Sequence, residues 1–490
     1  MNFFCDSEFT LAMALQQSGR YELAAGVFEH LLTATGESLN LLLALGVCRY
    51  HEGRYEQAIQ ALSRALALNP EDSNCLDTFG LCCQRLGKTT LAEILFRKAI
   101  DCHPGNLRAY HNLGNLFLDL KRPEETIKWY RLALDKNPDD AAAQCEMGKL
   151  YLKFLYLTEA CEHFRNALRL NPELSEASLS LATTTLLAGD FTNGWRYYMK
   201  RFTHRDALNQ DRHYSSRWPL WKGEPFFGKR LIVHCEQGVG DSIQFARFLP
   251  EVKKRGGRLI FHVQEALLPL FESYAGIDEI DVLSRRPWES LKADLYAPLL
   301  NVPACLGVTL RSLPAETPYL FAGEPDKTRW QQRLSADKYR IGIMWAGNPN
   351  HVNDRNRSIP MEALASLSDH PGIQLYSLQK DISHHQVRML KDRYGIISIG
   401  NDFVDFGDTA AALANLDLMI TVDTAIAHLA GAMARPVWVL LPYLPDWRWM
   451  LHREDSPWYP TMRLFRQPQA GDWEHVLNTI RKELRIQYCP

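Results

Sequence analysis

The sequence has no apolar run of the roughly 18–20 residues that a membrane-spanning helix needs. Residues 1–10 have no basic stretch and carry Asp6 and Glu8, so no secretory signal is expected there. An excess of charge is also missing, because 55 Lys and Arg stand against 57 Asp and Glu. Nucleic-acid binding, which needs a basic surface, is therefore not expected, although a local anion site is compatible with this balance.

Paired cysteines are absent as well. The chain has 11 Cys but no C-x-x-C pair, and Cys82 and Cys83 are adjacent, which suits neither a zinc site nor a redox loop. We expect small buried thiols in a reducing compartment, and hence a cytoplasmic protein. With 46% hydrophobic and 23% charged residues, the 490-residue chain has the composition of a globular protein of about three domains.

A strict spacing of 34 residues marks the N-terminal region. A glycine, a large apolar residue and a proline recur in this order, which resembles the tetratricopeptide repeat, a hairpin of two helices. We expect the glycine to let the two helices approach, the large side chain to fill the gap, and the proline to open the next helix at its first turn. With one weaker copy at each end, six repeats form an α-solenoid over residues 1–205. The positions in register are Gly46, Gly80, Gly114 and Gly148, then Leu62, Phe96, Tyr130 and Phe164, and finally Pro70, Pro104, Pro138 and Pro172.

Such an array has no chemistry of its own, and two uses remain open for it. Its concave face can hold a protein or peptide partner, which we favour, or the array can form a homodimer. A connector follows at residues 206–228, where Trp221, Phe226 and Phe227 predict packing onto the neighbouring domains and not a flexible linker.

From residue 229 short apolar strands alternate with helices. This pattern is the βαβ signature of a parallel sheet, and it restarts at Arg340. We therefore predict two Rossmann-like lobes, 229–335 and 336–490, that face each other across a cleft.

Three loops carry candidate site residues. Gly238 and Gly240 follow the strand at 231–235, and we expect them to permit a tight turn and the close approach of a ligand. The loop is no dinucleotide fingerprint, because Ile243 stands where its third glycine belongs. Asp241 opens the next helix, and two interpretations remain: a first-turn carboxylate that stabilises the helix, or a general base in the cleft.

The second loop begins with Asp423 and Thr424, which end a strand and open a helix whose N-terminus favours an anion such as phosphate. His428 lies one turn further on the same face. A role in binding is favoured over a structural one because strand, turn and histidine coincide.

The third loop, residues 348–360, carries Asn348, Arg355 and Arg357. It is either a clamp for a diphosphate or a solvated surface loop. Gln379 follows the strand at 373–377 and is a candidate contact for a nucleotide or sugar. Trp447 and Trp449 either stack on a base or sugar or pack in the core.

Two of these segments together resemble a known family. Residues 238–250 resemble the N-terminal motif of the lipopolysaccharide heptosyltransferases (glycosyltransferase family 9), and residues 405–442 resemble their donor motif. The whole chain resembles bacterial tetratricopeptide glycosyltransferase-like proteins. Its architecture is similar to that of the O-linked N-acetylglucosamine transferases.

The resemblance implies a GT-B fold, with the acceptor in the first lobe and a nucleotide-sugar, most plausibly a UDP-sugar, in the second. It implies that Asp241 is the catalytic base, that Asp423, Thr424 and His428 form the donor-phosphate turn, and that Arg357 meets the diphosphate. Ala425 departs from the glycine usual in heptosyltransferases. Because the first lobe has no Asp-x-Asp at a strand end, neither a metal nor another cofactor is expected. The predicted reaction is inverting.

The leading hypothesis is a glycosyltransferase that acts on a protein acceptor recruited by the repeats. Two alternatives remain. The first is a scaffold that has lost catalysis and binds a partner or a nucleotide-sugar. The second is a transferase that acts on a lipid-linked or polysaccharide glycan.

Overall fold

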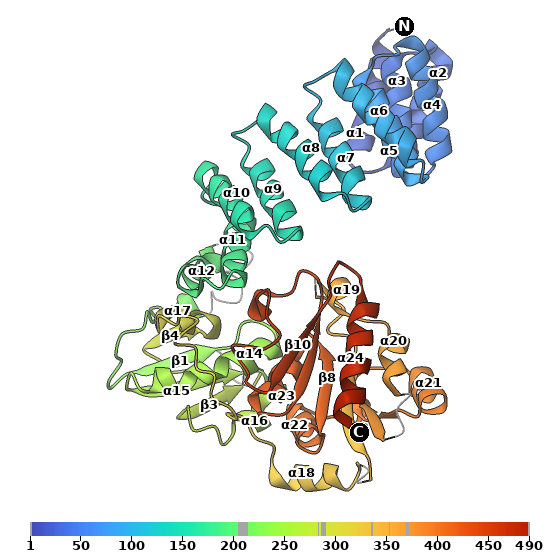
Figure 1. Cartoon of the computed structure of the whole chain (residues 1–490). Coiled ribbons are helices and arrows are strands. Elements are labelled where there is room, and N and C mark those ends of the chain that lie inside the picture. The colour runs from blue at the N-terminus through green and yellow to red at the C-terminus, as the bar shows by residue number, and fades with distance from the viewer. Residues whose placement is uncertain are drawn as a thin grey trace. The chain divides into compact units, whose positions relative to one another are not determined.

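The structure is a computed structural model of the 490-residue chain. It describes residues 2–203, 214–282, 284–285, 291–334, 337–351, 353–368 and 372–488. Two compact units make up the chain, Met1–Pro172 and Glu173–Pro490 (Figure 1). Residues 206–213 of the predicted connector and the predicted lobe boundary at 335–336 lie outside the described residues.

The first unit consists of helical hairpins with the predicted period. Each hairpin pairs two helices that are consecutive in the chain. The helices are α1 (Asn2–Gln17), α2 (Tyr21–Thr35), α3 (Leu39–His51), α4 (Tyr55–Leu68), α5 (Ser73–Arg85), α6 (Thr89–Cys102), α7 (Leu107–Asp119), α8 (Pro123–Lys136), α9 (Ala141–Lys153) and α10 (Leu157–Leu170).

The glycines in register allow close packing within each hairpin, as predicted. A Cβ added to Gly114 on α7 would lie 2.4 Å from the Tyr130 ring of α8. The corresponding distance is 2.6 Å from Gly80 to the Phe96 ring. Since real Cβ atoms do not approach so closely, the large side chain occupies the space that the glycine leaves empty.

The expected position of the prolines is wrong. Pro70 lies in the turn that follows α4, and α5 begins only at Ser73. The N-cap is Asp72, whose Oδ1 accepts a 2.8 Å hydrogen bond from Cys75 N. Asn106 caps α7 in the same way. A proline is compatible with the first turn of a helix, as Pro123 of α8 shows. At the repeat junctions Asp72 and Asn106 are instead the N-caps, two residues after the proline, and their side chains accept from first-turn N–H groups.

The second unit begins with a sixth hairpin, α11 (Ser175–Leu187) and α12 (Phe191–Tyr198), followed by η1 (Met199–Thr203). Aromatic side chains of α12 pack into the α/β part of the unit. The ring centroids of Trp195 and Trp447 are 5.3 Å apart, and those of Phe191 and Trp458 are 5.8 Å apart. The last repeat is therefore part of the same compact unit as the two sheets.

Both sheets are parallel in every strand pair that the structure describes. The first contains β1 (Arg230–His234), β2 (Arg258–Val263), β3 (Glu279–Val282) and β4 (Leu295–Pro298) in the order β3-β2-β1-β4. The second has the order β10-β9-β8-β5-β6-β7. Its strands are β5 (Tyr339–Met344), β6 (Ile373–Ser377), β7 (Ile397–Ser398), β8 (Leu418–Val422), β9 (Val437–Leu441) and β10 (Met462–Arg466).

Read from β7, the second sheet has the strand order 3-2-1-4-5-6 of a doubly wound fold, and the first sheet has the beginning of the same order. The predicted α/β architecture of the C-terminal half is therefore confirmed at the level of parallel sheets with helices.

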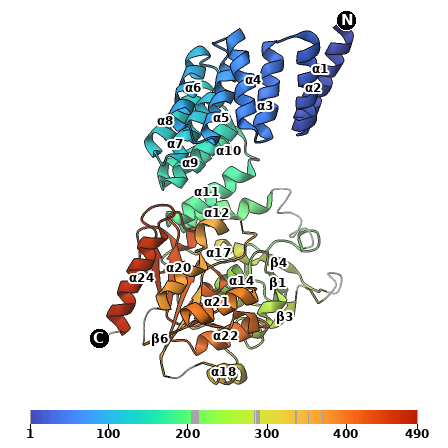
Figure 2. The ribbon, with the colours of Figure 1, turned by 90° about the vertical axis from the view of Figure 1, so that its right-hand side faces the viewer.

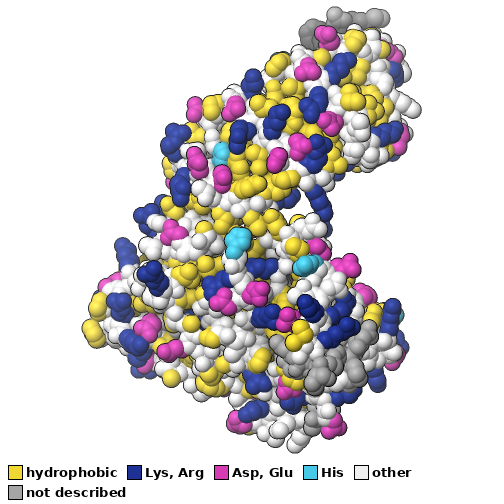
Figure 3. All heavy atoms as spheres, in the orientation of Figure 1, with side chains coloured by type: hydrophobic (Ala, Val, Ile, Leu, Met, Phe, Trp, Pro, Cys, Tyr) yellow, Lys and Arg dark blue, Asp and Glu magenta, His cyan; other side chains and the backbone are white. Residues whose placement is uncertain are grey.

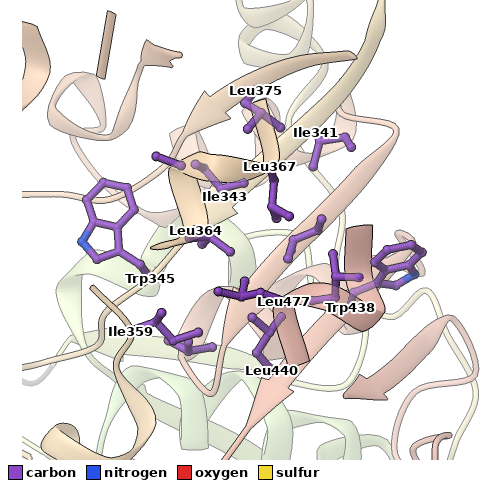
Figure 4. Close-up of a cluster of buried hydrophobic side chains, with 14 of the residues drawn as sticks. Ile341, Ile343, Trp345, Ile359, Leu364, Leu367, Leu375, Trp438, Leu440 and Leu477 are labelled. Carbon is purple, nitrogen blue, oxygen red and sulfur yellow. The ribbon is translucent and has the colours of Figure 1, made fainter. Parts of the chain in front are cut away.

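Alternating residues of the second sheet form a core with the helices on one face. Ile341 and Ile343 of β5 pack with Leu477 and other residues of α24 (Trp473–Tyr488), as Figure 4 shows. Helices α20 (Met361–Ala365) and α21 (His384–Tyr394) add Leu364 and Leu390 to this face (Figure 2). Helices α22 (Phe406–Ala414) and α23 (Ala425–Ala432) instead contact helices of the first lobe.

The described part of the connector is packed only in part. Trp221 and Phe226 are buried, and their rings meet edge to face at 6.2 Å. Phe227, in contrast, is 76% exposed. None of the helices in the described ranges combines the length and the hydrophobicity that crossing a membrane requires.

Candidate functional site

The topology of the sheets brings the predicted site residues together. In a doubly wound sheet, ligands bind beyond the carboxyl ends of the strands where the strand order reverses. In the second sheet this point lies between β5 and β8, which lead into the loop from Trp345 and into Asp423. In the first sheet it lies between β1 and β4, and β1 leads into the glycine loop. Three loops distant in sequence are therefore directed toward one region.

Two short helices make the contact between the lobes. α14 (Val239–Phe245) packs against α23, and a Cβ added to Gly240 would lie 3.2 Å from Ala425 Cα and 3.2 Å from His428 Cδ2. The expectation of a tight glycine turn is wrong, because Gly238 has an extended backbone with a φ of −64° and Gly240 has no positive φ. What Gly240 permits here is the close approach of a helix from the other lobe.

Asp241 lies at the start of α14, and both of its carboxylate oxygens are engaged. Oδ2 accepts a 3.0 Å hydrogen bond from Gly238 N, so the predicted stabilisation of the helix start is present. Oδ1 accepts a hydrogen bond from Arg448 Nη2 of the second lobe, and the Asp241 side chain is 20% exposed. Burial raises the pKa of Asp241, and Asp446 adds to this, whereas Arg448 opposes it. A carboxylate with a raised pKa is a stronger base than an ordinary one.

Arg448 is the centre of the polar contacts between the lobes. It lies in η8 (Trp447–Trp449), and its side chain is 9% exposed. Its Nε donates to Gln244 Oε1 at 2.7 Å, and its Nη1 donates to Asp446 Oδ1 at 2.9 Å. Burial lowers the pKa of Arg448, but the carboxylates of Asp446 and Asp241 outweigh that effect and raise it overall. The guanidinium is therefore held as a buried cation by groups from both lobes.

Asp423 faces the same charges from the end of β8. Burial raises its pKa, as does Asp446, while Trp449, Arg357 and Arg448 lower it. The net effect raises the pKa of Asp423, so the site favours the protonated carboxyl more than water does. Asp423 thus lies among two arginines and a second carboxylate, as a residue at a charged binding site does.

Thr424 and His428 lie on α23 as predicted, but both are buried. Thr424 is the N-cap of the helix, and its Oγ1 lies 3.1 Å from Thr421 Oγ1. His428 Nδ1 lies 3.1 Å from Tyr459 Oη, and its ring stacks on Trp449 at 5.2 Å. Burial lowers the pKa of His428 far below its usual value, with a further contribution from Arg448. The imidazole is therefore neutral and fixed in orientation.

Arg357 reaches the same switch point from α19 (Asp354–Arg357). Its Nη1 donates to the Asp423 backbone oxygen at 3.0 Å, and its Nε donates to Asp354 Oδ1 at 3.3 Å. A Cβ at residue 347 would lie 2.4 Å from Arg357 Nη2, so Gly347 leaves room for the guanidinium. Asn348 is exposed, and its Oδ1 accepts from Asn350 N at 3.0 Å.

Gln379 borders this loop from β6, but its side chain has a structural partner. It is buried, and its Oε1 accepts a 3.1 Å hydrogen bond from Ala346 N. Of the two interpretations of Trp447 and Trp449, core packing is the one the structure shows. Both are buried, Trp449 against His428 and Trp447 against Trp195.

Four polar residues of this region were not predicted. Arg448 and Asp446 lie beside Trp447 and Trp449 in the sequence, but no local pattern predicts that Arg448 pairs with the first lobe. Arg247 of the first lobe is buried, and it donates to the Trp458 oxygen of the second lobe at 2.6 Å. Tyr198 of the last repeat is buried, and its Oη accepts a 3.2 Å hydrogen bond from Gln237 Nε2 in the glycine loop.

The site is therefore a cluster of fixed, mostly buried polar groups. Within the described ranges, no three His, Cys, Asp or Glu side chains come together as the ligands of a metal ion would. Figure 3 shows acidic and basic side chains interspersed on the visible face. Positive charge near the site comes from particular residues, Arg357 and Arg448.

Comparison with known proteins identifies the repeats. Residues 9–73 and 95–128 match two family models described as tetratricopeptide repeat, which confirms the predicted repeats in this region. Protein FlbA of Caulobacter vibrioides is 26% identical over 340 residues, which are 64% of this chain and 55% of FlbA. The chain thus spans about half the length of this curated relative.

Solved structures of repeat proteins are also similar. A thermophilic TPR protein from Thermus thermophilus has a TM-score of 0.32 and 19% identity, and the match covers 37% of this chain and 99% of that one. The C-terminal part of a TPR repeat-containing protein from Cytophaga hutchinsonii has a TM-score of 0.35 and 20% identity, with coverages of 40% and 78%. Pseudomonas aeruginosa pilF has a TM-score of 0.34 and 18% identity, and the match covers 43% of this chain and 92% of that one.

Proposed function

We propose that the second unit is a glycosyltransferase of the GT-B type, which moves a sugar from a nucleotide-sugar to an acceptor hydroxyl. The observation that carries the proposal is the meeting of two strand-order switch points, one from each parallel sheet, with Asp241 on one side and Asp423, Thr424 and Arg357 on the other. The sequence resemblance to glycosyltransferase family 9 rests on these same two segments.

The proposed reaction is a single displacement. Asp241 removes the proton of an acceptor hydroxyl, and the resulting oxygen attacks the anomeric carbon of the sugar. The bond between that carbon and the diphosphate oxygen breaks, and its electron pair leaves with the diphosphate. The raised pKa of Asp241 supports its role as the base, since desolvation strengthens it.

The leaving diphosphate needs positive charge and hydrogen-bond donors. Arg357 lies at the end of β8 beside Asp423, and the first N–H groups of α23 have no partners within their own helix. Together they supply the stabilisation that a divalent metal provides in other transferases. Arg357 and Arg448, which both lower the pKa of Asp423, also offset the charge of its carboxylate beside the diphosphate.

The repeats supply the acceptor in this proposal. The first helices of successive hairpins carry exposed polar side chains, as where Gln84 Nε2 of α5 donates to Asp119 Oδ2 of α7 at 2.8 Å. A helical array with a polar surface suits an extended protein segment. We therefore propose a protein acceptor recruited by the repeats.

Replacing Asp241 by Asn tests the base. The single amide oxygen can still accept from Gly238 N, but the ion pair with Arg448 is lost and Arg448 keeps only Asp446 as its carboxylate partner. Binding of the nucleotide-sugar is expected to persist while turnover falls by roughly 10²- to 10⁴-fold, and circular dichroism checks that the variant is folded. In the unaltered protein, turnover is expected to fall as the pH is lowered through the pKa of Asp241. Because this pKa is raised, the fall is expected at a higher pH than for an ordinary carboxyl group. Donor binding is measured by thermal shift with UDP-, GDP-, ADP- and CMP-sugars, and transfer is measured by release of the nucleotide.

Glu265→Gln is the matched control. Glu265 is exposed and pairs with Arg285 at the surface of the first lobe, so turnover is expected to stay unchanged. Normal turnover in Asp241→Asn would disprove the assignment of the base.

One observation favours a second candidate, a scaffold without catalysis. Both oxygens of Asp241 are engaged, and α14 packs on α23 at Gly240. A scaffold predicts that a nucleotide-sugar raises the melting temperature without any release of nucleotide in the presence of acceptor. Release that depends on Asp241 would exclude it.

A further inference from the structure

A separate pocket lies where β10 ends and α24 begins. Its volume is about 430 Å³, and it is bounded by the end of β10, by residues 452–454 and by the first two turns of α24. Three arginines line it, Arg453, Arg463 and Arg466, together with His452, His475 and Glu454. Such a volume is in the range of small-molecule sites. Of these side chains, the proposed transfer reaction uses none.

Arg466 is the unusual residue of this pocket. Its Nε donates to the backbone oxygen of Arg453 at 2.9 Å, and its Nη2 donates to the backbone oxygen of Trp449 at 2.5 Å. Its third nitrogen, Nη1, is buried and makes no hydrogen bond to any described residue. A buried donor of a charged group that makes no hydrogen bond destabilises the folded state.

The charge of Arg466 is also uncompensated. Burial lowers the pKa of Arg466 to about 10, and neighbouring Arg453 contributes to this. Arg453 itself pairs with both oxygens of Asp455, and Arg463 pairs with Glu483 at 2.6 Å. In the part of the chain that the structure describes, no carboxylate lies at ion-pair distance from Arg466. An anion in the pocket would supply the missing negative charge.

Helix α24 adds to the preference for an anion. The helix has 16 residues, and His475, Val476 and Thr479 of its first two turns line the pocket. The positive end of its dipole is therefore near the pocket, while Asp472 caps only one N–H group, that of His475. A guanidinium and a helix N-terminus are the two groups that proteins most often use for phosphate.

We propose that this pocket binds a small molecule that carries a phosphate group, at a site separate from the region between the lobes. Arg466 supplies the positive charge that no carboxylate compensates, with Arg453, Arg463 and the first turn of α24 around the pocket. Three segments of one unit border the pocket, and its volume suits a small molecule. This inference does not depend on the proposed transferase activity.

The pocket is connected to the candidate site through residues 449–453. The backbone oxygen of Trp449 accepts a hydrogen bond from Arg466, and the Trp449 ring stacks on His428. Between them, Met450 has a φ of 52° with a ψ of −168°, and His452 has a φ of 54°. Such conformations are strained for residues other than glycine and persist only where contacts hold them. An anion that fixes Arg466 would therefore also fix the backbone on which Trp449 and Arg448 are placed.

The test titrates the full chain with inorganic phosphate and with glycerol 3-phosphate, with chloride at matched ionic strength as the background. We expect saturable binding by calorimetry and a rise in melting temperature. The titrations are made in the Arg357→Met background, because Arg357 belongs to the proposed diphosphate site and could itself bind phosphate. In this background Arg466→Met is expected to weaken binding at least tenfold, whereas Arg285→Met, which removes an exposed arginine of the first lobe, leaves it unchanged. Tighter binding of glycerol 3-phosphate than of phosphate would identify a phosphomonoester as the ligand, and the reverse would identify the free ion.

A second variant covers the possibility that Arg466→Met does not fold. Thr479→Phe fills the pocket from α24 and leaves Arg466 in place, so it is expected to abolish binding while circular dichroism remains unchanged. The proposal is overturned if the unaltered protein binds neither probe at millimolar concentration. It is equally overturned if binding in the Arg357→Met background survives Thr479→Phe, or if it is lost with Arg285→Met.

Discussion

At the scale of single residues, the contact between the lobes depends on buried charges. Arg448 compensates two carboxylates, Asp241 of the first lobe and Asp446 of its own. Removing one partner of a buried pair is costly because the other charge stays buried without compensation. The same residues that define the candidate site therefore also stabilise the closed arrangement of the lobes.

Arg448→Met is expected to lower the free energy of unfolding of the second unit by about 3–5 kcal/mol. Asp241 and Asp446 would remain buried without their cation, and the pKa of both Asp241 and Asp423 would rise further, since Arg448 lowers each of them. Urea denaturation followed by tryptophan fluorescence measures the change. Arg285→Met is the control: this arginine is 56% exposed beside Glu265, and its loss is expected to cost less than about 1 kcal/mol. Equal effects of the two substitutions would contradict the assignment.

At the scale of elements, the repeats depend on contacts between one glycine and one large ring. Because the ring of Tyr130 fills the space beside Gly114, the two helices of the hairpin are held at one distance along the array. The specificity of the fold thus comes from packing, and not from helix propensity, which disfavours glycine inside a helix.

Gly114→Ala is expected to destabilise the first unit by about 1–3 kcal/mol, because the added methyl group overlaps the Tyr130 ring. Gly26→Ala provides a matched control. Gly26 lies inside α2, and no atom lies within 4 Å of its added Cβ, so this substitution is expected to stabilise by up to about 1 kcal/mol. Thermal unfolding followed by circular dichroism separates the two outcomes. If both variants were stabilised, the hairpin packing described here would be wrong.

At the scale of the whole molecule, each of the two compact units has a hydrophobic core of its own. Units with separate cores are expected to unfold in separate cooperative transitions.

Differential scanning calorimetry is therefore expected to show two transitions. Gly114→Ala should lower only the one that belongs to Met1–Pro172, and Arg448→Met only the one that belongs to Glu173–Pro490. Phosphate should raise only the second, because its proposed pocket lies entirely in that unit. A single transition that all three changes shift together would show that the units unfold as one.

Much of the architecture could be predicted because it follows from periodic patterns within short stretches of the sequence. The 34-residue register gives the hairpins, and short apolar strands that alternate with helices give the parallel sheets. The order of the strands in the second sheet then explains why Arg357 reaches Asp423. The expected position of the prolines was wrong because their spacing shows only that each lies near a turn between two helices. The spacing does not show whether the proline lies before the N-cap or after it, in the first turn of the helix.

The remaining parts of the site could not be predicted because they depend on packing between distant segments. Nothing near Gly240 in the sequence shows that Ala425 will lie against it, and nothing near Arg448 shows that Asp241 will be its partner. The burial of His428 and Gln379 has the same origin. Each side chain forms a hydrogen bond with a residue that lies more than 30 positions away in the sequence.

The packing of the sixth hairpin into the second unit has an evolutionary consequence. Since α12 is joined to the sheets by Trp195 and Phe191, the boundary between the units falls after five hairpins, at Pro172. Duplication, loss or exchange of 34-residue blocks upstream of Pro172 leaves every contact within Glu173–Pro490 in place. The number and sequence of the upstream repeats can thus diverge at a different rate from the second unit, with Pro172 as the natural junction for recombination or for an engineered fusion.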